Sequence, residues 1–572
     1  MFFRILRNPI FIIGLVSVAA LVVAIFAMAA TLSERVAAEL SARLGRSFTA
    51  QQTHFSIWPT PQIILSDVTV AGVSSMAEPA LTVKAFRVPV SVQQLFTDIF
   101  APDTIFLDQP QLNLIVNSAG HSNVMIEAEG ADIKNDRGGA LAKPIHVIFT
   151  DGRLKYVDET KNVRFLLQAI SGNADVGGQS VLTSQGSLDI ADQHAVYSIS
   201  IASLARAFGE GSPLDLNVEA AGSSFGFSGR VVAASGLDLA GQATLDASDG
   251  SRLFKWLGVK LGGLQTAQKF LLRGAMESQG PVFLMKNADV RYGTMAGNGN
   301  FSFSGAGVRP NITAAMTVGT LDLNNYGDGK TALNVGAGWS DTAFDLADLN
   351  AVDAQFHVAA DTVKFGKLTA GKAILEGAVK DGALQTKISS AALSNGSGTI
   401  EVKLDGHEAV AQLQMNFDVA SVDALPLLQT FTGQSWLAGP LTLKAQLTSH
   451  GQSTAAMIGN LSGQVDASLQ NGDLVGADLE ALAKLAITNP VNGWNGKLTS
   501  GVSGHAASNV ADGIVSLGET QFTTANSSIT ASGEVDVLRQ ALALESDVTM
   551  TGGKPTKYHI DGPWATPKIT GN

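Results

Sequence analysis

Histidine is the side chain best suited to acid–base chemistry near neutral pH and to zinc binding, and the chain contains nine. They are widely spread: the nearest pair in sequence is His121 and His146, and no His-Glu-x-x-His motif occurs. Cysteine is absent, so a thiol nucleophile, a thiolate metal site and a disulfide are all excluded. The sequence therefore predicts no local zinc site and no cysteine-based catalysis.

Three short motifs partly match ligand or catalytic signatures. Gly329-Lys330-Thr331 resembles the end of a phosphate-binding loop, but Asn324 stands where that loop requires glycine. A calcium loop starting at Asp322 fails at its twelfth position, which is Leu333 rather than glutamate. Gly226–Gly229 lacks the spacing of a nucleophile elbow. The sequence therefore offers no catalytic set, no metal site and no cofactor site, and we expect a protein that is not an enzyme.

The charge and hydropathy of the chain narrow the class of protein further. The chain has 572 residues, only 15% of them charged, and a formal net charge of -12, so it lacks the basic surface that nucleic-acid binding needs. Its mean hydropathy is +0.19, which is high for a water-facing protein. The apolar segment at residues 10–30 accounts for only part of this value. The remainder of the chain is therefore unusually apolar, although it contains no second membrane span.

Residues 10–30 form an uncharged, apolar run that follows Arg4 and Arg7. The run is long enough to cross a bilayer as a helix, and it is longer than the apolar part of most signal peptides. A cleaved signal peptide is the alternative, since Ala27-Met28-Ala29 fits a cleavage site. We predict an uncleaved single-pass anchor, with residues 1–9 cytoplasmic and the rest exported. Residues 31–46 continue as a predicted amphipathic helix.

Beyond residue 60 apolar and polar residues alternate with period two, as they do on half-buried strands. In one such run Leu413, Met415, Phe417 and Val419 alternate with polar residues. Turn dipeptides separate the runs and predict antiparallel meanders; they are Asp151-Gly152, Asp381-Gly382, Asn395-Gly396, Asp405-Gly406, Asn471-Gly472 and Asp512-Gly513. Helices are predicted at 249–262, 422–431 and 477–488, to pack on the core or cap a sheet edge.

The apolar face of such a sheet must be covered. A sandwich or a closed barrel covers it with protein, whereas a curved sheet leaves a lengthwise groove that suits acyl chains. Aromatic residues are too few for the girdles of a lipid-facing barrel. Periodicity does not distinguish a groove from a sandwich core. The candidate groove residues are Leu413, Met415, Phe417, Val419, Leu441, Leu443, Leu447, Val465, Leu469, Phe301 and Phe303.

A series of short motifs runs along the chain. After the predicted anchor come Leu44-Gly45-Arg46 and Ile57-Trp58-Pro59, then a strand with Pro110 followed by alternating leucines, then Gly120 and Asn123. Further segments are Asp151-Gly152-Arg153-Leu154, Leu321-Asp322-Leu323-Asn324-Asn325-Tyr326, Leu461-Ser462-Gly463 and Gly562-Pro563-Trp564-Ala565-Thr566-Pro567. Together these motifs resemble those of the AsmA family of bacterial proteins, and the resemblance extends over nearly the whole chain.

The resemblance implies a mainly β protein, anchored in the bacterial inner membrane by an N-terminal transmembrane helix. The bulk of the chain would be a periplasmic, elongated and curved antiparallel β-sheet that forms a groove, with a few short helices. It also implies a role in outer-membrane homeostasis, through phospholipid movement or through support of outer-membrane protein assembly. The expected organisation is a tail (1–9), an anchor (10–30), a juxtamembrane helix (31–46), an N-terminal AsmA-like module (47–140), a middle sheet (141–330) and a C-terminal AsmA-like sheet (331–572).

Three functions compete at this stage. The first is an inner-membrane-anchored groove that binds or conducts phospholipid between membranes, with acyl chains as its partners. The second is a scaffold or regulator that carries no lipid and binds outer-membrane assembly proteins. The third is a secreted, adhesin-like β-protein. A bound lipid would support the phospholipid groove, and a stable protein complex would support the scaffold. Cleavage near Ala29 would support the secreted protein.

Overall fold

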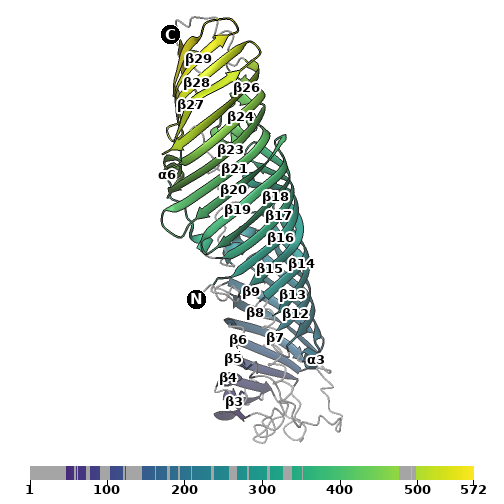
Figure 1. The fold of residues 1–572 in the computed structure, drawn as a ribbon. Coiled ribbons are helices and arrows are strands. Elements are labelled where there is room, and N and C mark those ends of the chain that lie inside the picture. Colours follow the sequence, from purple (N-terminus) through teal and green to yellow (C-terminus); the bar gives the residue numbers. More distant parts are fainter. Residues whose placement is uncertain are drawn as a thin grey trace. The chain divides into compact units, whose positions relative to one another are not determined.

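A computed structural model presents the chain (Figure 1). It describes residues 47–56, 60, 62–72, 78–89, 103–119, 123, 145–160, 163–176, 181–190, 193–207, 209–233, 237–256, 267–279, 282–305, 309–325, 338–350, 352–475, 491–492 and 498–571. The predicted anchor at 10–30, the juxtamembrane helix and the helix at 477–488 lie outside these residues. Within the described part, no helix is both long and apolar enough to cross a membrane.

The chain divides into two compact units, and the division runs through strand β15 (Met295–Ser304). The elements of the first unit are β1 (Phe48–Thr49), β2 (Gln52–Ser56), β3 (Gln62–Val70), β4 (Leu81–Pro89), β5 (Thr104–Val116), β6 (Ile145–Asp158), β7 (Val163–Val176), β8 (Leu182–Ile190), β9 (Gln193–Ile201), α3 (Leu204–Ala207), β10 (Ser212–Ala220), β11 (Ser223–Val232), β12 (Asp238–Ala247), α4 (Gly250–Trp256), β13 (Phe270–Gln279) and β14 (Val282–Tyr292).

The second unit is described in the same way. Its elements are β16 (Asn311–Asp322), η4 (Leu323–Asn325), η5 (Ala347–Asn350), β17 (Asp353–Phe365), β18 (Leu368–Lys380), β19 (Ala383–Leu393), β20 (Gly396–Asp405), β21 (Ala411–Asp423), α5 (Ala424–Thr432), β22 (Leu437–Ala438), β23 (Pro440–Gly451), α6 (Thr454–Gly459), β24 (Ser462–Val475), β25 (Val491–Asn492), β26 (Leu498–Ala511), β27 (Ile514–Thr523), β28 (Ser527–Asp536), β29 (Ala541–Met550), β30 (Thr556–Pro563) and β31 (Lys568–Gly571). The prediction of a mainly β chain with few short helices and a long antiparallel sheet is confirmed.

In the first unit β3 to β14 pair with their neighbours in chain order. One pair differs from the antiparallel meander that the turn dipeptides predict, because β5 and β6 run parallel from Thr104↔His146 to Val116↔Asp158. A parallel pair needs a long crossover, whereas a hairpin turn reverses the chain. None of the dipeptides predicted as turns lies between these two strands, since Asp151-Gly152 lies inside β6.

Asn123 completes the hydrogen bonding at the end of β5. Its side chain is fully buried. The Oδ1 atom accepts a hydrogen bond from the Ile115 amide at 2.8 Å, and Nδ2 donates to the Asn113 carbonyl at 2.8 Å. The Asn123 backbone amide also donates to the Ile115 carbonyl. The pairing of β4 with β5 ends at Leu112, and beyond that point Asn123 supplies the hydrogen bonds that a neighbouring strand would otherwise supply to β5.

We expect Asn123→Ala to destabilise the first unit by about 1–3 kcal/mol, because two part-buried backbone groups lose their partners. Urea denaturation gives the change in free energy of unfolding, and hydrogen exchange at the Ile115 amide locates it. Ser118→Ala, which truncates an exposed side chain nearby, serves as the control. Equal stability of the two variants would show that the Asn123 contacts are not important.

The first unit encloses one continuous apolar core. The core cluster extends from Phe48 in β1 to Phe283 in β14, and Leu154, Leu167 and Leu182 within it are fully buried. Burial raises the pKa of the Tyr197 phenol in this cluster to about 12, although a hydrogen bond with Ser184 opposes the shift. These strands therefore cover their apolar face with protein, as a sandwich core does.

In the second unit, the strands from β17 to β21 are antiparallel, and a short connection joins each strand to the next one in sequence. Asp381 and Gly382 form the two-residue turn between β18 and β19, with φ angles of 50° and 80°. Asp512 and Gly513 do the same between β26 and β27, with φ angles of 48° and 74°. Positive φ at both positions is the requirement of a type I′ hairpin, so the turns predicted at these dipeptides are confirmed.

Two of the predicted turns are wrong. Asp151-Gly152 lies inside β6 and Asn471-Gly472 inside β24, and the register shifts at both places. Asp151 and Asn471 adopt left-handed φ angles of 51° and 49°, but the chain does not reverse there. The extra residue is accommodated as a β-bulge, which uses the same residue types as a tight turn.

Helices were predicted at two described places. The helix expected at 422–431 is present as α5, capped by Asp423 before it and by left-handed Gly433 after it. The helix expected at 249–262 is present from Gly250 to Trp256, and the rest of that prediction lies outside the described residues.

Candidate functional site

No group of three or more His, Asp or Glu residues in the described part of the chain is placed to hold a metal ion. The histidines that contact carboxylates do so on the surface: His357 lies 3.0 Å from Glu376, and His505 lies 2.8 Å from Asp466. Exposed pairs of this kind contribute little to stability.

The apolar side chains of β17 to β24 form continuous rows across the strands. Register pairing places Phe417 opposite Ile400 on one side and Ala445 on the other. We call the following set the apolar track, comprising one row from β17 to β24 and three apolar residues of the adjacent row. Its members are Val358, Leu375, Ile388, Ile400, Phe417, Ala445 and Val465, with Val402, Met415 and Leu447.

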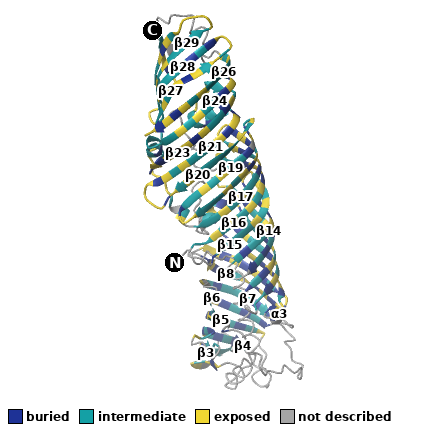
Figure 2. Cartoon of the chain, in the orientation of Figure 1, coloured by how far each residue is buried: buried dark blue, intermediate teal, exposed yellow. Residues whose placement is uncertain are grey.

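The track is only partly covered. All of its side chains except Ala445 have intermediate exposure, whereas the core residues of the first unit are almost inaccessible. Figure 2 shows the contrast, since dark blue is frequent in β5 to β8 and teal and yellow predominate in β17 to β23. An apolar row across seven strands whose side chains are half-buried, except at Ala445, forms a surface that remains available to another apolar group.

The structure places four of the eleven residues predicted from the sequence on the track and a fifth beside it. Phe417 and Val465 share one row with Ala445 between them, and Met415 lies opposite Leu447 in the next. Leu413, two residues before Met415, is also half-buried and lies opposite Leu404.

The other predicted residues lie deeper or elsewhere. Val419 is opposite Leu443, and Leu441 is opposite Leu469. Val419, Leu441 and Leu469 are buried, with exposed fractions of 2%, 7% and 3%. Phe301 and Phe303 belong to the first unit, where Phe303 packs against the core cluster.

Sequence reasoning missed five large members of the track: Val358, Leu375, Ile388, Ile400 and Val402. The alternation of Ile400 and Val402 with Glu401 carries the signal for two of them. Leu375 is harder to find, because Ile374 beside it is also apolar yet 41% exposed on the opposite face. Two adjacent aliphatic residues do not reveal which one faces the partner surface.

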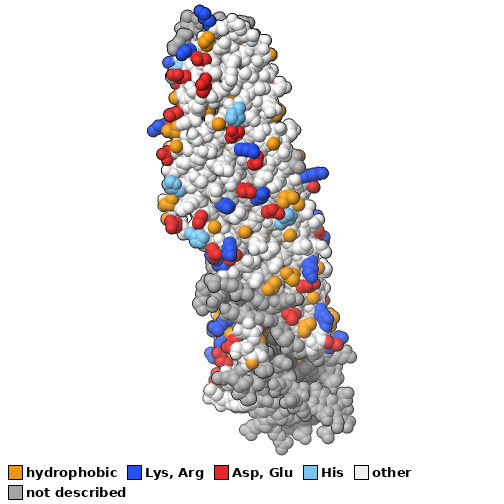
Figure 3. Space-filling model, in the orientation of Figure 1, with side chains coloured by type: hydrophobic (Ala, Val, Ile, Leu, Met, Phe, Trp, Pro, Cys, Tyr) orange, Lys and Arg blue, Asp and Glu red, His pale blue; other side chains and the backbone are white. Residues whose placement is uncertain are grey.

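The opposite face of the same strands is polar and charged. His357, Glu376, Lys387 and Glu401 are paired in register from β17 to β20, and the row continues with Asn416, Gln446, Gln464 and Asn509. Lys387 lies 3.0 Å from Glu401, and its hydrogen bond and positive charge lower the pKa of that carboxyl. Figure 3 shows acidic and basic side chains interspersed on the face in view. This face is therefore suited to water.

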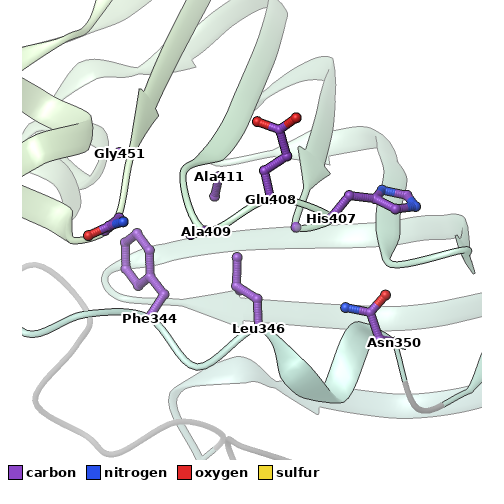
Figure 4. A pocket seen from close by; sticks show the side chains of 10 residues that line it. Phe344, Leu346, Asn350, His407, Glu408, Ala409, Ala411 and Gly451 are labelled. Atoms are coloured by element: carbon purple, nitrogen blue, oxygen red, sulfur yellow. The ribbon is translucent and has the colours of Figure 1, made fainter.

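A small pocket lies where residues 338–350 cross the strand ends (Figure 4). Phe344 and Leu346 line it from this segment, and His407, Glu408 and Ala409 line it from the β20–β21 connection. The segment is held by the Phe344 amide, which donates to the Gln452 carbonyl, and by Trp339 Nε1, which donates to the Val537 carbonyl at 2.8 Å. The volume of about 270 Å³ is below the usual range of ligand pockets.

Fold and site together define a class: a mainly β protein with a long antiparallel sheet that has one charged face and one incompletely covered apolar face. The model of the AsmA family matches residues 298–520, which include the whole apolar track. This segment of the chain is therefore similar to the AsmA family. The motifs quoted from residues 44–123 lie outside the matched segment. Neither a curated protein nor a solved structure matches the chain.

Proposed function

We propose that the chain binds phospholipid through its acyl chains on the apolar track and conducts it between membranes, in support of outer-membrane homeostasis. The observation that carries this proposal is the continuous row of apolar side chains, half-buried except at Ala445, opposite a charged face. The match of residues 298–520 to the AsmA family and the β-rich fold are consistent with it.

The dimensions of the track suit an acyl chain. Its longer row crosses seven strands, and six spacings of about 4.8 Å give a length of roughly 29 Å. One acyl chain fills about half of a ~30 Å hydrocarbon core. The row is therefore longer than one extended acyl chain, and a lipid has room to move along it.

The chemistry of the track favours sliding over tight binding. Covering each methylene group stabilises the complex by ~0.8 kcal/mol, independently of its position along a uniform apolar row. Val358, Leu375, Ile388, Ile400 and Val465 carry no polar atom that would fix a headgroup. The headgroup would remain in water while the acyl chain lies on the track.

The proposal includes the location predicted from the sequence. An anchor at residues 10–30 would hold the chain in the bacterial inner membrane, with its N-terminus cytoplasmic and the sheet periplasmic. AsmA family proteins are generally membrane-associated, which agrees with this placement.

Photo-cross-linking from the full chain in cells tests the proposal. A photoreactive phenylalanine analogue replaces Phe417 on the track, and in a matched variant it replaces the adjacent Asn416 on the charged face. We expect phospholipid adducts at position 417, detected by mass spectrometry, at least tenfold more abundant than at position 416.

Two results would contradict the proposal. Equal adduct levels at the two positions would mean that lipid contacts are non-specific. Protein adducts without lipid at position 417 would favour the alternative, a scaffold or regulator that binds outer-membrane assembly proteins.

A further inference from the structure

Helix α5 covers one border of the apolar surface. It follows β21 directly and is nine residues long. Leu427 in its second turn packs against two clusters at once, one containing Val419 and Val422, the other Leu441 and Leu469. The helix therefore lies on the same face of the sheet as the apolar track.

The two ends of α5 are held differently. At the start, the Asp423 carboxylate accepts hydrogen bonds from the amides of Leu425 at 3.2 Å and Gly439 at 3.3 Å. At the far end, the Thr430 hydroxyl accepts a hydrogen bond from the Lys367 amide at 2.8 Å, and the Phe431 ring lies 6.2 Å from the Phe365 ring. The start is fixed within its own connection, whereas the far end depends on contacts with the β17–β18 turn.

Burial changes sharply along the strands beneath the helix. On β21, Val422 is 0% exposed and Val419 is 2% exposed, but Phe417 and Met415 are half-buried. On β18, Ala373 is 1% exposed and Leu375 is half-buried. The open track and the covered surface are thus one continuous apolar face, and the change begins where α5 lies.

We propose that the surface beneath α5 is an occluded acyl-chain site that continues the track, and that an acyl chain enters it by displacing the far end of the helix. The inference rests on the proposed lipid function. When the helix moves, an acyl chain would make the apolar contacts with the sheet that Leu427 makes in the closed position. The displacement costs one hydrogen bond and one ring contact at the far end, while the capped start acts as the hinge.

A reversible disulfide tests this inference, because the chain contains no cysteine. Lys367→Cys with Thr430→Cys ties the far end of α5 to the β17–β18 turn when oxidised. Leu443 is half-buried, lies opposite Val419 and packs against the same cluster as Leu427, so the photoreactive analogue at this position reports the border of the covered surface. The analogue at Phe417 in a second variant reports the open track. As a control, Lys387→Cys with Glu401→Cys joins two paired strands on the charged face.

We expect oxidation to lower phospholipid adducts at Leu443 at least fivefold, to leave those at Phe417 within twofold, and to be reversed by reductant. Oxidation of the control pair should change neither position. Adducts at Leu443 that are absent or insensitive to oxidation, while Phe417 still cross-links, would overturn the occluded site alone. Absence of lipid at both positions in the reduced protein would overturn the lipid function and this inference with it.

Discussion

Replacement of both Met415 and Phe417 by aspartate is expected to reduce phospholipid cross-linking from the track at least tenfold. The two side chains lie in adjacent rows on the apolar face, and a charge there must be hydrated, which acyl chains prevent. The measurement uses the full chain with the photoreactive analogue at Ile400, opposite Phe417. Because both positions are only half-buried, the variant should still fold.

The same strand supplies the control for this experiment. Gln414→Asp with Asn416→Asp adds the same two charges on the opposite face of β21. We expect that variant to cross-link lipid as the unmodified chain does. A similar loss in both variants would indicate general destabilisation, and full retention in the Met415 and Phe417 variant would contradict a role of the track.

In the first unit, where the apolar face is covered by protein, a substitution on that face should change stability rather than lipid binding. Leu167→Ala is expected to lower the free energy of unfolding by about 2–5 kcal/mol, because it removes a fully buried side chain and leaves a cavity. Leu166, its neighbour in β7, is 41% exposed and provides the matched control. Leu166→Ala should change stability by no more than about 0.5 kcal/mol.

Urea denaturation of the purified full chain measures both variants, and hydrogen exchange in β6 to β8 assigns the effect to the first unit. A small and equal effect in the two variants would mean that this core is loosely packed. The unit would then resemble the track, and the contrast between a closed and an open apolar face would be wrong.

Much of the fold could be predicted from the sequence because apolar and polar residues alternate along its strands. The period-two run at Leu413 to Val419 identifies both faces of β21, and type I′ dipeptides identify two of the hairpins. The parallel pair of β5 and β6 was not accessible. Alternation specifies a half-buried strand but not the direction of its neighbour.

The site could be predicted from the sequence only in part, for a physical reason. The sequence pattern places Phe417 on the apolar face whether protein or lipid covers that face. Only the incomplete burial of its side chain in the structure favours lipid. The covered rows beneath α5 have the same pattern. Their burial depends on Leu427 in a helix whose position no local signal determines.

The hairpin connectivity of β17 to β21 has a consequence for how such a chain changes length during evolution. Each strand contacts the next strand in sequence, so energies are nearest-neighbour in character, as in repeat proteins. Removal of a whole hairpin preserves strand direction and the alternation of the two faces, whereas removal of a single strand reverses every strand that follows. The reach of the sheet therefore evolves in steps of two strands, about 9.6 Å each.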